Sequence, residues 1–508
     1  MSGMQLRLIT RAFWGFVGWG LPLIVVFLVA PALLRALGIA RFGVLMTVFI
    51  APLIAFHLDF GLVTAGVRRI ALRLTEGKVD ASGTLASLTL ALGVIGLLLG
   101  GTLAVLSAPV SSALGFTDVL SADEGVILIQ TSAAWIMVSL LSAVPTLVAR
   151  AAQALTWLAA TQTVTTTALW LGALILARNA QPLSYTVALG IALSIASAGA
   201  TLLAVRSRID WTGSFRIRRN LVVDDANFVI GTFVSQLAGS VVFYGDRVLV
   251  SLLGSPAMAG AYALCVNVAN KTLAAIVAMT SFAFPHASGL TAQQDRRQFE
   301  QLSQSLDRAV IVIIAPLLAL GIALAGPFLR LWLAEFSSDE LVTTFQILWL
   351  AFTIPAFAVP MSYLLAASGN AQLAARYSTL AAAVVLIAMP LLIPPLGLTG
   401  AALATLLGMS ISPIFSLAVR RKLRLTPGAD RARFWMGIVC GVVAEIAVLA
   451  VFTTAIKTWA ELLLIGAASW LTFYLTRATL RLLSPEEAQL VCKSANAIRN
   501  LRNCSRNC

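Results

Sequence analysis

The chain has 508 residues, of which 59% are hydrophobic and only 11% are charged. A soluble domain carries about 25% charged residues, so this composition excludes a mainly soluble protein and requires lipid as the main solvent. The net charge of +14 does not indicate a nucleic-acid partner, because the Lys and Arg residues fall in short clusters between apolar runs rather than on one basic surface.

Apolar runs of about 20 residues, each long enough to cross about 30 Å of hydrocarbon, follow one another along the chain. The first run is too long for the hydrophobic region of a cleaved signal peptide, so we expect it to remain as a span. The sequence therefore predicts an all-α polytopic membrane protein with about fourteen spanning helices. They are expected at residues 12–34, 42–63, 84–106, 125–147, 158–177, 184–205, 227–253, 258–284, 309–329, 343–366, 377–395, 399–419, 435–455 and 461–476.

The distribution of basic residues predicts the orientation of these spans. With the N-terminus in the cytoplasm, most Lys and Arg residues fall in the inner loops. The outer loops then hold only Arg35, Arg41, Arg178, Arg330 and Lys457. By the positive-inside rule, both termini should face the cytoplasm.

The loops and motifs favour a transporter over an enzyme. The longest predicted outer loop, about residues 107–124, leaves no room for an external catalytic domain. The sequence also contains no phosphate-binding Gly-rich loop before a helix and no nucleophile elbow. We therefore expect no catalytic residues and no cofactor.

The cysteines indicate neither a disulfide framework nor a metal site. Cys265 and Cys440 lie in predicted spans, and Cys492, Cys504 and Cys508 lie in a basic tail. The spacing of the tail cysteines matches no familiar zinc pattern, and a cytoplasmic tail is a reducing environment. We expect free thiols.

Two turns with similar sequences suggest an internal duplication. Leu-Gly and Phe-Gly-Val at 37–38 and 42–44 are echoed by Leu-Gly and Ala-Gly-Ala at 253–254 and 259–261. Six predicted helices separate the two turns, as a parallel duplication of six-helix units requires. The predicted parts are an N-lobe at 1–205, a cytoplasmic basic linker at 206–226, a C-lobe at 227–419, a basic loop with two further helices at 420–476, and a cytoplasmic basic tail at 477–508.

Charged residues at membrane depth are the candidate functional groups, because a charge inside a bilayer is usually paired or faces a hydrated cavity. Arg247 should lie roughly 10 Å below the outer turn at Gly254, and Lys271 roughly 20 Å below the start of the next span. Two interpretations stay open for these cations. They line a cavity, or one of them pairs with Asp246 as a structural ion pair.

Two more carboxylates lie in predicted spans. Asp59, beside His57, is near the inner end of the second span, and Glu445 is near the middle of the thirteenth. Each carboxylate, like Asp246, could couple transport to an ion or serve as a structural partner. We expect His57 to be a buried histidine with satisfied hydrogen bonds rather than a proton carrier.

Short motifs give the chain a resemblance to a known family. They are the turn at 37–43, Leu-Asp-Phe-Gly-Leu at 58–62 followed by Arg-Arg at 68–69, Tyr-Gly-Asp-Arg-Val-Leu at 244–249, the turn at 253–263, and Pro285. With these motifs the whole chain resembles the polysaccharide flippases of the multidrug/oligosaccharidyl-lipid/polysaccharide exporter superfamily.

The resemblance implies two six-helix lobes around a central cavity, formed largely by helices one, two, seven and eight, and transport by alternating access. It implies export of undecaprenyl-diphosphate-linked oligosaccharides across the bacterial inner membrane for surface polysaccharide synthesis. Arg247 and Lys271 are then the nearest candidates for holding the diphosphate, although span one lacks the mid-membrane cation found in some relatives.

The same resemblance implies the partners and a rival function. The partners are the lipid-linked oligosaccharide, membrane lipids, a polysaccharide polymerase and the chain-length machinery. The rival is a drug or small-molecule cation antiporter of the same superfamily, a branch that usually has twelve helices and an acidic cavity. The sequence leaves open the saccharide, the coupling ion and the oligomeric state.

Overall fold

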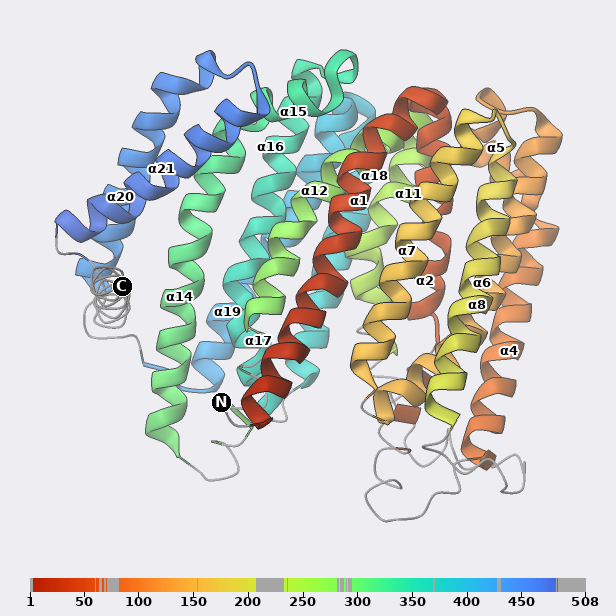
Figure 1. Cartoon of the computed structure of the whole chain (residues 1–508), viewed down its shortest axis with the longest axis horizontal. Coiled ribbons are helices and arrows are strands. Elements are labelled where there is room, and N and C mark those ends of the chain that lie inside the picture. Colours follow the sequence, from red (N-terminus) through yellow and green to blue (C-terminus); the bar gives the residue numbers. More distant parts are fainter. Residues whose placement is uncertain are drawn as a thin grey trace, which may run out of the picture. The chain divides into compact units, whose positions relative to one another are not determined.

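The computed structural model is helical, and no strand occurs in the ranges that it describes (Figure 1). These ranges are residues 3–59, 61–63, 66–67, 70, 82–152, 154–206, 233–234, 236–280, 283, 287–288, 290, 295–368, 371–426, 431–480 and 482. The predicted all-α polytopic membrane fold is confirmed.

The helices form two compact units. The first unit comprises Met1–Asn267 and Gln372–Gly408, and the second comprises Val268–Ala371 and Met409–Cys508. The predicted linker at 206–226 lies outside the described residues apart from Arg206. The division into two lobes at that linker stays a prediction.

Most described helices of the first unit lie on predicted spans, but a short helix and a 3₁₀ turn occupy the predicted outer loop at 107–124, and the first helix continues into the second predicted span. They are α1 (Gly3–Val48), α2 (Ala51–His57), α4 (Ser82–Val105), α5 (Ser107–Ala113), the 3₁₀ turn η1 (Phe116–Asp118), α6 (Ala122–Ala151), α7 (Leu155–Arg178), α8 (Leu183–Val205), the π-helical turn η3 (Val241–Gly245), α11 (Asp246–Leu253), the start of α12 (Pro256–Thr280), and most of α18 (Ala371–Met409).

Glycines in the left-handed backbone region break the two longest helices of this unit. In α1 the break is at Gly38, with φ 74° and ψ 162°, and in α18 it is at Gly397, with φ 57°. Such φ values are strained for residues with a Cβ atom. Figure 1 shows the chain rising through the first part of α1 and returning through α2. The predicted turn between the first two spans is therefore confirmed.

The two echoed turns meet in space. A Cβ atom added to Gly43 would lie 1.7 Å from the Pro256 carbonyl oxygen, and one added to Gly260 would lie 2.8 Å from the Ile39 carbonyl oxygen. The backbones of α1 and α12 thus touch at glycines that occupy equivalent places in the two sequence echoes. Small residues permit this closeness between membrane helices.

The second unit is built around α14, with the C-terminal helix pair α20 and α21 packed on it. Its described elements are the rest of α12, α14 (Arg296–Ala323), α15 (Ala325–Leu333), η4 (Ala334–Phe336), α16 (Asp339–Thr353), η5 (Ile354–Ala358), α17 (Val359–Ala367), α19 (Ile411–Lys422), α20 (Arg431–Phe452), η6 (Thr453–Ala455) and α21 (Trp459–Thr479). Pro355 lies in the 3₁₀ turn that divides α16 from α17, and Pro360 lies in the first turn of α17. This agrees with the physics of proline, which cannot donate a helix hydrogen bond.

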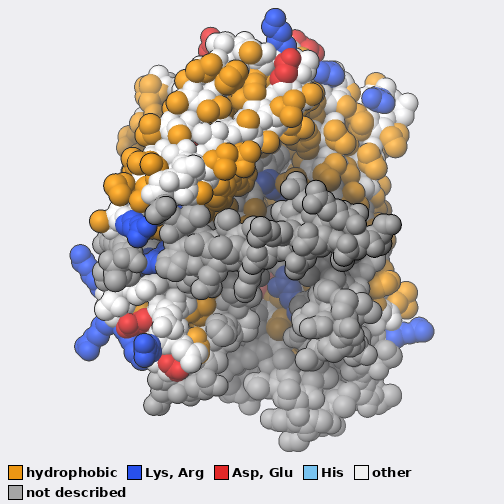
Figure 2. Space-filling model, turned by 60° about the vertical axis from the view of Figure 1, so that its left-hand side comes forward, with side chains coloured by type: hydrophobic (Ala, Val, Ile, Leu, Met, Phe, Trp, Pro, Cys, Tyr) orange, Lys and Arg blue, Asp and Glu red, His pale blue; other side chains and the backbone are white. Residues whose placement is uncertain are grey.

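Eleven stretches within the described ranges are long and apolar enough to cross a membrane. Two of them, Leu21–Ala55 and Gln372–Lys422, contain the breaks at Gly38 and Gly397, so each holds more than one straight helix. The total of fourteen stays a prediction. Figure 2 shows hydrophobic side chains covering much of the described surface, as contact with lipid requires.

Neither described cysteine is in a disulfide bond. Cys265 is buried and Cys440 is partly exposed. Cys492, Cys504 and Cys508 lie outside the described residues.

Candidate functional site

The candidate site begins where a π-helical turn ends. The turn covers Val241–Gly245, and Asp246 and Arg247 open α11 directly after it. A π turn inserts an extra residue into a helix and is often found at functional sites, because it changes the direction of the side chains that follow. Both side chains are buried, with exposed fractions of 0% for Asp246 and 7% for Arg247.

Asp246 is held by two donors. Its Oδ1 accepts a hydrogen bond from the Arg247 backbone N–H at 2.8 Å, and its Oδ2 accepts one from the Tyr262 hydroxyl at 3.0 Å. The Tyr262 oxygen also lies 2.6 Å from the Thr405 hydroxyl. Since Tyr262 donates to the carboxylate, Thr405 is the donor in this second bond. The chain of bonds ties α11 to α12 and α18.

Arg247 has an unused donor. Its Nη2 lies 3.5 Å from the Asn267 side-chain oxygen, a long hydrogen bond, and its buried Nε has no partner among the described residues. A buried guanidinium group with a free N–H is suited to an anion, because a charge-assisted bond would remove the cost of leaving the donor unsatisfied. The described part of the chain gives no side-chain ion pair between Arg247 and Asp246.

Lys271 lies on α12, four residues after Asn267. Residues four apart share a helix face, so the two side chains leave α12 on the same side, one turn apart. The Lys271 side chain is exposed. Lys271 belongs to the second unit, whereas Arg247 and Asn267 belong to the first.

His57 and Asp59 lie at the end of α2. The His57 Nδ1 is 2.8 Å from the Leu53 carbonyl oxygen, and the imidazole ring is 5.6 Å from the Tyr244 ring in the π turn. Asp59 is buried, and its two oxygens accept the backbone N–H groups of Gly61 and Val63 at 2.9 Å each. These are local side-chain-to-backbone bonds of the Asx-turn kind. They support the structural alternative for Asp59.

Glu445 differs from the other two carboxylates. It lies on α20 with an exposed fraction of 0%, and neither carboxylate oxygen has a hydrogen-bond partner among the described residues. The structural-pairing alternative therefore finds no partner in the described part of the chain.

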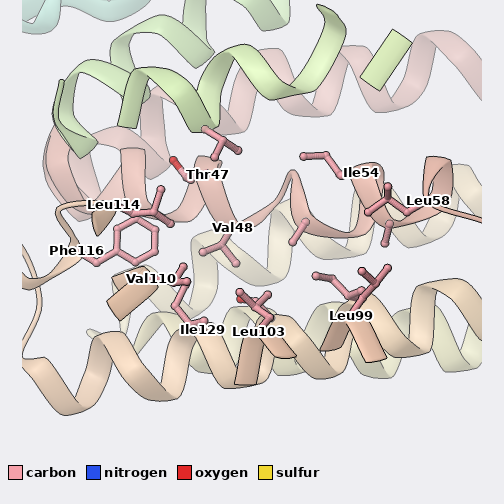
Figure 3. Close-up of a pocket in the computed structure, with 15 residues that line it drawn as sticks. Thr47, Val48, Ile54, Leu58, Leu99, Leu103, Val110, Leu114, Phe116 and Ile129 are labelled. Atoms are coloured by element: carbon pink, nitrogen blue, oxygen red, sulfur yellow. The ribbon is translucent and has the colours of Figure 1, made fainter. Parts of the chain in front are cut away.

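The first unit also contains a partly open apolar cavity of about 270 Å³ (Figure 3). It is lined by side chains of α1, α2, α4, α6 and α11, with Val110, Leu114 and Phe116 between them. Thr47 and Ser132 line it too, but their hydroxyl groups donate to the carbonyls of Gly43 and Leu128 in their own helices. The lining suits hydrocarbon rather than a charged headgroup.

Sequence reasoning missed this cavity and the role of Thr405. Apolar residues line cavities, lipid-facing surfaces and protein cores alike, so the pattern of the lining carried no distinct signal. Thr405 follows Tyr262 by more than a hundred residues, and only tertiary structure brings their hydroxyl groups together.

The fold matches solved transporters. The chain superposes on the lipid II flippase MurJ in an inward closed conformation with a TM-score of 0.71, at 16% identity, over 93% of this chain and 99% of that one. An inward-facing multidrug resistance MATE family transporter of the MOP superfamily gives a TM-score of 0.61 at 12% identity, over 80% and 98%. A Vibrio cholerae MATE transporter in its bent form gives 0.55 at 18%, over 82% and 97%. At these identities the likeness shows the fold.

Comparison of the amino-acid sequence with protein families identifies the family of this chain. No curated protein matches the chain closely enough to identify a relative. A family model described as "Polysaccharide biosynthesis protein" matches residues 10–291, more than half of the chain. The chain therefore belongs to the polysaccharide biosynthesis protein family, within the superfamily of polysaccharide flippases and multidrug exporters that its motifs resemble.

Proposed function

We propose that the protein is a flippase that moves undecaprenyl-diphosphate-linked oligosaccharides across the bacterial inner membrane by alternating access. Family membership and the transporter fold support the general role. The observation that carries the substrate class is Arg247, a buried guanidinium group with an unpaired Nε beside a π-helical turn. A cationic chamber matches the diphosphate, whereas a drug cation would favour an acidic one.

Arg247 and Lys271 have different tasks in this proposal. The planar guanidinium of Arg247 offers two N–H groups to one phosphate, and the flexible ammonium of Lys271 supplies a point charge. Asp246 fixes the start of α11 through the Arg247 backbone N–H and Tyr262. Asp246 thereby holds the start of α11, from which the Arg247 side chain extends.

The test is export in cells that lack the native gene. Deletion should cause one lipid-linked oligosaccharide to accumulate on the inner leaflet, which would identify the substrate. Arg247→Ala and Lys271→Ala should each stop export with protein level unchanged, and Lys271→Arg should keep part of it, because a point charge is easily replaced. Arg178→Ala is the matched control, since Arg178 is an exposed arginine at the end of α7, and it should export normally.

The ion-pair alternative makes a different prediction. If either cation only neutralises Asp246, its removal leaves an unpaired buried carboxylate and lowers protein abundance. Asp246→Asn combined with Lys271→Ala would then restore both abundance and export. Full export by abundant Arg247→Ala protein, or accumulation of a cationic drug instead of a lipid-linked sugar in the deletion strain, would refute the proposal.

A further inference from the structure

Glu445 is a buried carboxylic acid side chain that the proposed diphosphate site does not use. It lies on α20 between two apolar layers of the second unit. One layer contains Val312, Phe434, Ile438 and Phe473, and the other contains Leu320, Leu324, Leu449, Ile456 and Leu462. Ile438, Glu445 and Leu449 are seven and four residues apart, so they share one face of α20. The carboxyl group is therefore enclosed by α14, α20 and α21.

The neighbouring helix α21 presents a serine at this level. A Cβ atom on Gly441 would lie 3.2 Å from the Phe473 carbonyl oxygen, so Gly441 of α20 lies opposite Phe473 of α21. One helical turn further along this antiparallel pair, the same register brings Glu445 opposite Ser469. Ser469 is fully buried, and its hydroxyl donates to the Gly466 carbonyl at 2.9 Å. Its proton is used, so the hydroxyl oxygen remains as an acceptor.

The third helix, α14, carries a backbone acceptor in the apolar layer next to Glu445. Pro316 lies in α14 one turn after Val312, which belongs to the same apolar layer as Ile438. Proline has no N–H, so the Val312 carbonyl lacks its usual helix partner. An ionised carboxylate needs donors, whereas a protonated carboxyl group can donate its O–H to such acceptors. The surroundings of Glu445 thus suit the protonated form.

The nearest charged groups on the packed helices lie away from this layer. Arg308 of α14 and Arg477 of α21 both lie over the Phe434 ring at 5.9 Å, and Phe434 is eleven residues from Glu445, roughly 16 Å along α20. Arg477 also lies over the Phe473 ring at 5.4 Å, and it is eight residues from Ser469, roughly 12 Å along α21. Asp307 is paired with Arg420. At the other end, Glu461 accepts the backbone N–H groups of Lys457 and Thr458 at 2.7 and 2.9 Å.

We propose that Glu445 is a proton-binding site that controls the packing of the α20 and α21 pair on α14. With one proton bound, the neutral side chain stays in its apolar layer. When the proton leaves, the carboxylate must reach water or a donor, because an unpaired charge in that layer costs several kcal/mol, and the helix pair separates from α14. The use of this switch in transport rests on the proposed function, but the site itself does not.

Infrared spectroscopy of the full-length purified protein tests for the bound proton. At neutral pH the spectrum should contain the carbonyl band of a protonated carboxyl group, and Glu445→Gln should remove it completely. Glu461→Gln is the matched control on the same helix pair, since glutamine also serves at that position of a capping box, and it should leave the band unchanged. Glu445→Asp, which keeps an acid, should shift the band rather than abolish it, and this variant covers a failure of the glutamine variant to fold.

Hydrogen exchange measured by mass spectrometry tests the switch. Raising the pH should remove the infrared band of the wild type. Over the same pH range, amide exchange in α20 and α21 should increase more in the wild type than in Glu445→Gln. Absence of the band, its persistence in Glu445→Gln, or exchange that tracks pH equally in both proteins would overturn the proposal. These measurements need no substrate, so failure of oligosaccharide export with an intact band would refute the flippase proposal and leave the proton site standing.

Discussion

The contact between α1 and α12 provides a strong test of the fold. The two backbones can touch only because Gly43 and Gly260 carry a hydrogen atom where other residues carry a Cβ atom. Gly43→Ala would place a methyl group 1.7 Å from the Pro256 carbonyl oxygen, whereas ordinary contact begins at 3.4 Å. The backbones would have to separate by about 1.7 Å, and neither partner is a flexible side chain that could move aside. Overpacking of this kind costs about 3 kcal/mol or more. Gly260→Ala meets the Ile39 carbonyl at 2.8 Å and should cost less.

The assay is thermal unfolding of purified protein. The measured quantity is the fraction of protein that remains monodisperse on size-exclusion chromatography after heating. Gly101→Ala is the control, because Gly101 lies inside α4 and an added Cβ atom there meets nothing within 4 Å. Replacing that helical glycine by alanine should be neutral or stabilise the protein by about 0.5–1 kcal/mol. Equal unfolding temperatures for Gly43→Ala and Gly101→Ala would refute the close approach of these helices.

Three further predictions follow from the site and the topology. Tyr262→Phe leaves the buried Asp246 Oδ2 without its donor, so the free energy of unfolding should fall by about 1–3 kcal/mol, and an unchanged thermal transition would contradict the bond. A reporter fused after Asn507 should be active only if it works in the cytoplasm, and periplasmic activity would contradict the predicted orientation. Short insertions in the linker at 206–226 should preserve export better than insertions at the turn 253–254, and equal sensitivity at both places would count against the two-lobe prediction.

The membrane fold followed from the sequence because it depends on local properties. A run of about 20 apolar residues must be helical in lipid, since every backbone polar group has to be satisfied within the segment. Predicted spans such as 84–106 and 184–205 therefore agree closely with α4 (Ser82–Val105) and α8 (Leu183–Val205). The turn at Gly38 was predictable from local sequence too, because a glycine between two apolar runs tolerates the positive φ of the break.

The partners of the polar residues were not predictable, because they depend on contacts between helices that are distant in sequence. Sequence placed Asp246 in a span but could not tell that Tyr262 binds it and that Thr405 in turn binds the Tyr262 hydroxyl. It left Asp59 and Glu445 with the same two alternatives, and only the tertiary structure shows that the two carboxylates have different surroundings. Asp59 folds back onto backbone N–H groups of its own segment, whereas Glu445 is enclosed by apolar layers with both oxygens unpartnered in the described part of the chain. Sequence determines which residues enter the membrane, and packing decides whether a charge there finds a donor, because a hydrogen bond requires atoms within about 3 Å.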